Sequence, residues 1–303
     1  EHLLFSVFSP GPLTLVVKRH PDLAPETTAG LPTVGLRIPS HPVARRLLQV
    51  AGVPVAAPSA NRSGRPSPTN TDMAWSEMDG HADAVLEGEP SSVGLESTIA
   101  WLDGGRVHIL RPGSISALAL VTVLRDAGLD WDLAEGHSGD GGQAATAGQA
   151  GAPATQAPGA PDAVPTGNAL PAAPGTQAPA APGTRYRHYS PLARVHLAGP
   201  DTSWDRLCAQ VAAHQDARWF WIGPRSRVDP AFLRLCKGQR CPESTPDFAR
   251  SLYRCLVEAD HEGMTDVVLW LEPSRSAQDP ESGLVEALRD RSRRAAGLLG
   301  GTP

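Results

Sequence analysis

A long stretch of low complexity in the middle of the chain limits what the rest can fold into. Residues 136–183 contain 15 Ala, 10 Gly, 8 Pro and 4 Thr, and they contain no aromatic residue, Lys or Arg. Such a segment cannot bury enough apolar surface to offset the entropy lost when a chain is ordered. The sequence therefore predicts two folded segments, residues 1–135 and 193–303, joined by a flexible linker over 136–184.

The first segment alternates predicted strands and helices. Apolar and β-branched runs predict strands at 13–17, 34–38, 53–57, 82–86, 98–102 and 107–110. Apolar residues at helical spacing predict helices at 41–51 and 71–78, and a third from Ser114 or Ser116 to 127. The first residues read as the approach to a further strand. This alternation predicts an α/β fold.

The second segment has a strand–helix–strand–helix order, which predicts a small parallel α/β domain. Its strands are expected at 193–197, 218–222 and 266–271, and its helices at 204–214, 246–261 and 283–299. All four cysteines lie in this segment and none forms a C-x-x-C pair, so reduced thiols are favoured over a zinc site.

The charge distribution argues against a dedicated nucleic-acid-binding domain. The net charge of the chain is -5, made up of -5 over residues 1–135, -2 over 136–183 and +2 over 184–303. A nucleic-acid binder would carry a basic domain. No apolar run approaches the ~18–20 residues of a membrane span, and the first residues lack the pattern of a signal peptide. We therefore expect a cytoplasmic protein.

The loop over residues 57–69 is the first candidate for ligand binding. It follows a predicted strand, and it carries Ser59, Asn61, Ser67 and Thr69 together with two Arg and a Gly. Hydroxyls, amides and exposed backbone N–H groups can hold phosphate oxygens. The alternative is a solvated turn in which Thr69 caps the following helix.

Three further polar segments are candidates. Ser97 lies at a strand entry within residues 94–99, which either meet an anion or form a β-turn. Arg111 ends a predicted strand, where it suits a phosphate, a carboxylate or a surface ion pair. Residues 185–192, with Tyr186 and Tyr189, either close over a site as a lid or pack against the second domain. Because the P-loop and dinucleotide motifs are missing from the sequence, phosphate binding would depend on hydroxyls, amides and Arg.

Five short sequence blocks follow one another along the chain in the order seen in the YrdC family. They are residues 10–14, 35–42, 58–69, 94–99 and 109–113. The chain therefore resembles this family, and the Tyr-Arg-His-Tyr run at 186–189 with the α/β tail resembles its longer, two-domain branch. The resemblance implies an open twisted mixed sheet with helices, followed by a small Rossmann-like parallel α/β domain.

The resemblance also implies a reaction. The expected activity is a nucleotidyltransferase, which makes L-threonylcarbamoyl-adenylate from L-threonine, bicarbonate or CO2 and ATP and releases pyrophosphate. Mg2+ is expected with the nucleotide. A downstream tRNA threonylcarbamoyl transferase machinery would pass the group to the adenosine beside the anticodon. Since this chemistry depends on positioning and charge stabilisation, no catalytic side chain is expected.

The resemblance assigns roles to individual residues by their place in the matching blocks. The expected ATP-binding residues are Thr14, Asn61, Ser67, Thr69, Arg111, Tyr186 and Tyr189. The expected threonine-binding residues are Lys18, Ser59 and Ser97.

The sequence departs from the family at its start. The family carries an upstream Thr/Ser-rich strand entry and a Lys-x-Arg motif, for which these residues offer no counterpart. We therefore expect an N-terminally incomplete synthase domain with weak or no activity on its own. Three alternatives stay open: a non-catalytic RNA-binding or regulatory module with weak RNA affinity, a carbamoyltransferase-associated domain, and a structural two-domain protein.

Overall fold

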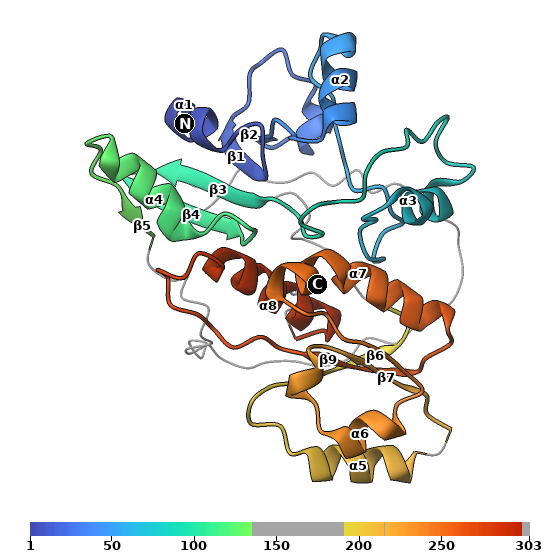
Figure 1. Ribbon diagram of the computed structural model, residues 1–303. Helices are drawn as coiled ribbons and strands as arrows, with labels where there is room; N and C mark the ends of the chain where they lie inside the picture. Colours follow the sequence, from blue (N-terminus) through green and yellow to red (C-terminus); the bar gives the residue numbers. More distant parts are fainter. Residues whose placement is uncertain (135–190, 215, 299–303) are drawn as a thin grey trace, which may run out of the picture. The chain divides into compact units, whose positions relative to one another are not determined.

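The computed structural model describes residues 1–134, 191–214 and 216–298 (Figure 1). The described residues before and after the long gap belong to one compact unit. They form two β-sheets, one of five strands from the first segment and one of four strands from the second. None of the helices in these ranges has the length and apolar character needed to cross a bilayer.

The five-stranded sheet is mixed, as expected. Its strands are β1 (Leu13–Lys18), β2 (Thr33–Leu36), β3 (Thr98–Asp103), β4 (Arg106–Arg111) and β5 (Asp132–Leu133), in the order β2-β1-β3-β4-β5. Strand β1 pairs antiparallel with β2 and parallel with β3, while β3 and β4 form an antiparallel pair. Because Leu13 lies opposite Thr98, the starts of β1 and β3 lie side by side. This register places the polar ends of the central strands together.

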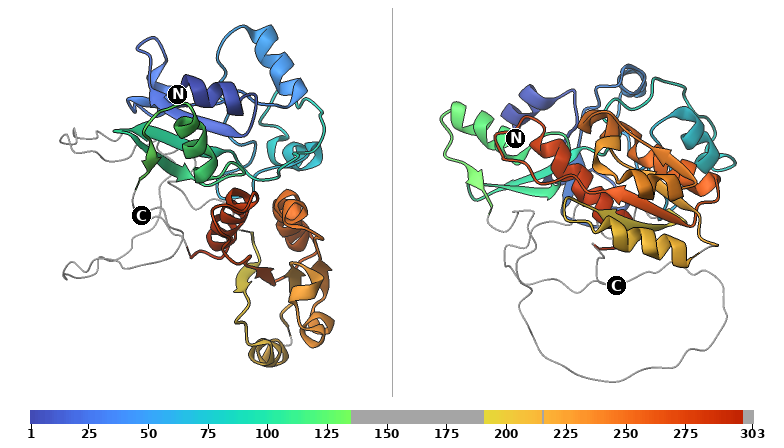
Figure 2. Two further views of the ribbon diagram at one scale, coloured as in Figure 1. Left: turned by 60° about the vertical axis from the view of Figure 1, so that its left-hand side comes forward. Right: turned by 60° about the horizontal axis from the view of Figure 1, so that its bottom comes forward.

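Four α-helices belong to the first segment: α1 (His2–Phe8), α2 (Pro42–Ala51), α3 (Thr71–Met78) and α4 (Ala117–Asp126), with a short 3-10 turn η1 (Pro25–Thr28). Helices α1 and α4 lie beside each other (Figure 2). Fully buried Leu4, Leu13 and Leu120 share a cluster drawn from α1, β1 and α4. The expectation of a strand approach at residues 1–5 was wrong, because packing of Leu4 stabilises a helix there.

The four-stranded sheet is entirely parallel, as predicted. Strands β6 (Arg194–Ala198), β7 (Trp219–Ile222), β8 (Gly238–Arg240) and β9 (Asp266–Trp270) follow the order β6-β9-β7-β8. Helices α5 (Trp204–Ala213) and α6 (Pro230–Leu235) cover one face, and a 3-10 turn η2 (Arg225–Arg227) precedes α6. Helices α7 (Thr245–His261) and α8 (Ser282–Ala295) cover the other face (Figure 1).

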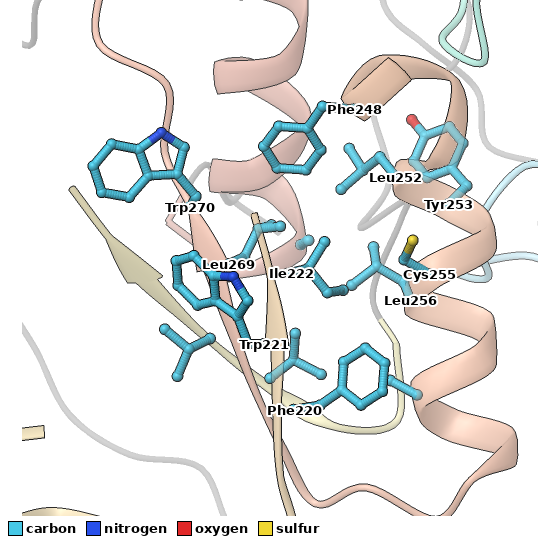
Figure 3. Packing of buried hydrophobic residues seen from close by; sticks show 14 of the residues in the cluster. Phe220, Trp221, Ile222, Phe248, Leu252, Tyr253, Cys255, Leu256, Leu269 and Trp270 are labelled. Atoms are coloured by element: carbon cyan, nitrogen blue, oxygen red, sulfur yellow. The ribbon is translucent and has the colours of Figure 1, made fainter. Parts of the chain in front are cut away.

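The core of the second segment lies between β7, β9 and α7. Figure 3 shows Phe220 and Ile222 facing the apolar stripe of α7, with the Tyr253 ring at the edge of this cluster. Trp221 points to the opposite face of β7, where its ring centroid lies 5.8 Å from that of Trp204 in α5. Met73 and Leu95 of the first segment belong to the same buried cluster. The core of the second segment therefore includes two side chains of the first, while the five-stranded sheet packs in separate clusters.

Two predicted strands are not formed. Residues 53–57 and 82–86 run as irregular backbone. Val53, Val55 and Leu86 are 63%, 46% and 60% exposed, and β-branched residues favour a strand only where they pack against neighbours. The sequence patterns also failed to indicate the short elements β5, α6 and β8.

Candidate functional site

Three of the predicted site residues meet where β1, β3 and β4 come together. Thr14 Oγ1 lies 2.7 Å from Ser97 Oγ, and Arg111 Nη2 donates to the same Ser97 Oγ at 3.2 Å. The guanidinium also donates to the Ser97 carbonyl oxygen from Nε at 3.2 Å and from Nη2 at 3.1 Å. Thr14 and Ser97 are buried. The Ser97 hydroxyl is therefore held between two side chains on neighbouring strands, and we call Thr14, Ser97 and Arg111 the hydroxyl–arginine cluster.

A tight turn after β4 supports this cluster. A Cβ added at Gly113 would lie 2.2 Å from the Thr98 backbone nitrogen, so only glycine permits this approach. Thr98 Oγ1 donates to the Ile115 carbonyl oxygen at 2.8 Å and accepts from the Ile115 N–H at 3.1 Å. The loop that follows Arg111 is thus fixed to the strand that follows Ser97.

The residue before Ser97 connects the cluster to the second segment. The Glu96 carboxylate accepts hydrogen bonds from the Ser67 hydroxyl at 3.0 Å and from the Tyr253 hydroxyl at 3.0 and 3.2 Å. Its Oε2 also accepts from Arg291 Nε at 3.0 Å, and the Arg291 side chain is 0% exposed. Sequence reasoning missed Glu96, Tyr253 and Arg291. One signal was available, since Arg291 follows Leu288 by three residues on the apolar face of a predicted helix, where a charge requires a partner.

The surroundings of Glu96 keep its carboxylate ionised. Burial by itself raises the pKa of Glu96, but the positive charges of Arg291 and Arg111 outweigh it. The hydrogen bond from Arg291 acts in the same direction, so the pKa lies below its ordinary value. At neutral pH the residue next to Ser97 in the chain is therefore an ionised carboxylate.

The 57–69 loop is held by its own contacts. Asn61 Nδ2 donates to the carbonyl oxygens of Arg62 and Arg65, both at 3.0 Å. Arg62 and Arg65 in turn pair with Glu77 of α3 at 3.2 and 3.4 Å. Burial raises the pKa of Glu77, but hydrogen bonds from Arg62 and the charges of both arginines bring it below its ordinary value. The two arginines therefore brace the loop.

Thr69 does not cap the following helix. Asn70 is the N-cap of α3, and its Oδ1 accepts from the Met73 N–H at 2.9 Å. Thr69 Oγ1 lies 3.5 Å from Met73 Sδ. The residue also lines a cavity of about 190 Å3, whose other lining residues are Asn70, Pro90, Ser91, Asp247, Arg250, Ser251 and Arg254.

Among the described residues, no hydrogen bond or ion pair joins Lys18 or Ser59 to the hydroxyl–arginine cluster. Lys18 is exposed, four residues along β1 from Thr14, which corresponds to ~13 Å in a strand. Ser59 is exposed in irregular backbone. Tyr186 and Tyr189 lie outside the described residues.

This arrangement suits binding and orientation of an anionic substrate. Two aligned hydroxyls and a guanidinium offer donors to carboxylate or phosphate oxygens. Within residues 1–134, 191–214 and 216–298, no group of three or more His, Cys, Asp or Glu side chains could hold a metal ion.

Comparisons with known families divide the chain in two. Residues 2–113 match the family described as telomere recombination. Residues 154–297 match the family described as threonylcarbamoyl-AMP synthase, C-terminal domain.

Similar proteins carry one recurring name. The threonylcarbamoyl-AMP synthase of Bacillus subtilis is 40% identical over 133 residues, which are 44% of this chain and 38% of that protein. The threonylcarbamoyl-AMP synthase of Pyrococcus abyssi is 27% identical over 300 residues, 97% of this chain and 73% of that protein. The chain thus spans well under two thirds of the Bacillus relative and about three quarters of the archaeal one.

A solved structure has a similar fold over nearly the whole chain. Pyrococcus abyssi Sua5 complexed with L-threonine superposes with a TM-score of 0.73 at 25% identity, covering 98% of this chain and 74% of that one.

Proposed function

Because this chain belongs to the Sua5/YrdC family in its two-domain form, we propose that it makes L-threonylcarbamoyl-adenylate from L-threonine, bicarbonate or CO2, and ATP. The observation that carries the proposal is the hydroxyl–arginine cluster, which places two hydroxyls and a guanidinium at adjoining strand ends. The relative solved with L-threonine supports threonine as the amino acid.

The proposed reaction has two steps. The α-amino nitrogen of threonine bonds to the carbon of CO2 and loses a proton, which gives a carbamate. A carbamate oxygen then bonds to the α-phosphorus of ATP while the bond from that phosphorus to the pyrophosphate oxygen breaks. Both steps depend on bringing anions together, which positioned donors accelerate. The chain would therefore act as a nucleotidyltransferase.

The chain's own residues would bind and orient the reactants. Ser97 would bind threonine, and Thr14 and Arg111 would contact the nucleotide. The remaining roles stay as predicted, with Asn61, Ser67, Thr69, Tyr186 and Tyr189 toward ATP and Lys18 and Ser59 toward threonine. Mg2+ carried on the ATP phosphates supplies charge neutralisation for the departing pyrophosphate, and Mg2+ typically keeps few protein ligands in such sites.

The wider role follows from the product. A mixed anhydride of this kind is a reactive donor, so we propose that a tRNA threonylcarbamoyl transferase machinery consumes it in the cytoplasm.

Binding is the first test, because it examines the candidate site separately from turnover. We expect isothermal titration to detect L-threonine binding that is stronger than D-threonine or L-serine binding, and to detect ATP binding. Threonine-dependent release of pyrophosphate is measured alongside. A protein that binds neither L-threonine nor ATP contradicts the proposal, and salt-dependent RNA binding in its place would favour the regulatory module.

A further inference from the structure

Helices α7 and α8 hold the two loops that carry Ser97 and Arg111. The backbone of α7 meets the first loop at Gly94, where an added Cβ would lie 2.3 Å from Arg250 Cα. The backbone of α8 meets the second loop at Gly283, where an added Cβ would lie 2.7 Å from the Ser116 nitrogen. Neither contact leaves room for a side chain, so the backbones of the two helices lie directly against the two loops.

Side chains of the same helices reach the carboxylate beside Ser97. Tyr253 of α7 and Arg291 of α8 both donate to Glu96, which also accepts from Ser67. Glu96 therefore joins four parts of the chain: the 57–69 loop, the strand entry with Ser97, α7 and α8. Its position depends on residues that lie far away in the sequence.

The burial of Arg291 is costly, which points to a role other than stability. A guanidinium removed from water is compensated only by good partners, and apolar replacements of buried ion pairs are often equally stable. Arg291 has two such partners, because its Nη1 also donates to Asp290 at 2.8 Å. Asp290 is held in turn by Arg294 Nε at 2.9 Å. Of the two carboxylates, Glu96 is the one next to Ser97, so the contact between Arg291 and Glu96 connects α8 to the substrate site.

We propose that Arg291 and Tyr253 are positioning residues for the substrate site: they fix Glu96, and through it the orientation of Ser67 and of the Ser97–Arg111 pair. The substrates themselves rest on the function proposed above. In this arrangement the second α/β segment completes the site of the first without contributing a group that touches the reacting atoms.

The test compares Arg291→Met with two matched variants. Arg294→Met removes an arginine from the same helix that also pairs with Asp290, but it leaves the Glu96 contact in place. Arg291→Lys keeps the charge but lacks the planar fork that reaches Glu96 and Asp290 together. Circular dichroism and thermal unfolding first establish that each variant is folded.

The first readout is hydrogen exchange measured by mass spectrometry, which is independent of the substrate. We expect Arg291→Met to speed exchange in peptides covering residues 94–99 and 111–116 by about tenfold. Arg294→Met should leave these peptides unchanged, and Arg291→Lys should lie between the two. Equal exchange in Arg291→Met and Arg294→Met overturns the proposal.

The second readout is the affinity for L-threonine. Because a misplacement of about 1 Å can cost up to about a hundredfold, we expect Arg291→Met to raise the Kd at least about tenfold, Arg291→Lys to restore part of it, and Arg294→Met to leave it unchanged. If the unaltered protein binds no threonine, the proposed function fails, while the exchange measurement still decides the positioning role.

A second variant covers the case in which Arg291→Met does not fold. Tyr253→Phe removes only the hydroxyl that donates to Glu96 and keeps the buried ring in the apolar cluster. We expect faster exchange over residues 94–99 in this variant as well. Unchanged exchange in folded Tyr253→Phe excludes Tyr253 from the positioning role.

Discussion

Ser97 is the most constrained side chain of the candidate site. Its hydroxyl contacts Thr14 Oγ1 and Arg111 Nη2, and its carbonyl oxygen accepts from the same guanidinium. Both of its polar groups are thus engaged in a buried position, where losing one partner leaves the other unsatisfied. A residue held in this way can present its oxygen in one direction only, which is what recognition of a small amino acid requires.

Ser97→Ala should therefore weaken both substrate binding and the fold, to a similar extent. We expect the Kd for L-threonine to rise about tenfold, equivalent to about 1.4 kcal/mol, and the free energy of unfolding to fall by about 1–2 kcal/mol. Isothermal titration and urea denaturation measure the two effects. Ser6→Ala is the control, because that exposed hydroxyl donates only to the Leu3 carbonyl oxygen of its own helix. Equal Kd values for Ser97→Ala and the unaltered protein would remove Ser97 from the site.

The lowered pKa of Glu96 predicts that this residue stabilises the fold less at acidic pH than at neutral pH. Burial raises its pKa, but Arg291 and Arg111 bring it below the usual value of 4.5, so folding favours the ionised form. The groups that face the carboxylate are Ser67, Tyr253 and the two arginines. Its stabilisation is complete above pH 4.5 and is lost as the pH falls through the pKa of the folded state.

Glu96→Gln isolates this effect from the other carboxylates. We expect the unaltered protein to exceed Glu96→Gln in free energy of unfolding by a constant amount at neutral pH. The difference should shrink below pH 4.5. Urea denaturation between about pH 3 and about pH 7 measures it. A difference that grows as the solution becomes more acidic would contradict the ionised state of Glu96.

At the scale of elements, α8 illustrates why packing outweighs local preference. Gly283 lies in the first turn of this helix, where alanine would ordinarily favour the helix by about 1 kcal/mol. The same alanine would place its Cβ 2.7 Å from the Ser116 nitrogen and 3.0 Å from the Gly113 carbonyl oxygen. Glycine is a poor helix former, but at this position its missing side chain allows α8 to approach the turn after β4.

Gly283→Ala should consequently destabilise the protein despite its helix propensity. We expect the free energy of unfolding to fall by about 1–3 kcal/mol, because backbone atoms have to move to admit the methyl group. Gly199→Ala serves as the control, since nothing lies within 4 Å of its added Cβ and its change should stay within about 0.5 kcal/mol. Chemical denaturation distinguishes them. A stabilised Gly283→Ala would show that α8 does not press against the turn.

The helices and strands also show how much of the fold could be predicted from local sequence patterns. Strand β1 (Leu13–Lys18) was predicted nearly residue for residue, because its β-branched run follows a Pro-Gly-Pro turn. Helix α3 (Thr71–Met78) was predicted at its observed bounds, although its cap is Asn70 and not Thr69. The expected strands at 53–57 and 82–86 failed because their apolar residues have no partner strand to pack against. Helix α1 was missed because its stability comes from Leu4 packing against α4.

The residues of the candidate site also differ in whether the sequence alone could indicate them. Ser97 and Arg111 could be singled out because each lies at a strand end, where polar residues stand out from an apolar run, whereas Thr14 came only from the family resemblance. Glu96 and Arg291 could not, because they are 195 positions apart and nothing local indicates their pairing. The roles of all ten predicted site residues stay predictions.

At the scale of the whole molecule, the first segment contributes buried side chains to the core of the second. Leu95, from the loop that leads to Ser97, belongs to the same buried cluster as Phe248 and Leu252 of α7. With the Glu96 contacts, this arrangement makes the described segments cooperate in folding. Unfolding of the second segment would therefore expose Met73 and Leu95 of the first.

Leu95→Ala should lower the stability of both sheets together. We expect a loss of about 2–4 kcal/mol, the usual cost of truncating a buried leucine. Scanning calorimetry should show one transition before and after the substitution, with equal calorimetric and van't Hoff enthalpies. Two resolved transitions, only one of which shifts, would contradict a shared core.

The pairing of Glu96 with Arg291 also has a consequence for synthesis on the ribosome. The two residues are separated by 195 positions, and at ~5–20 residues per second the arginine is added about 10–40 s after the glutamate. Throughout that interval the nascent first sheet carries a carboxylate whose guanidinium partner does not yet exist. The candidate site can therefore be completed only after α8 has left the ribosome.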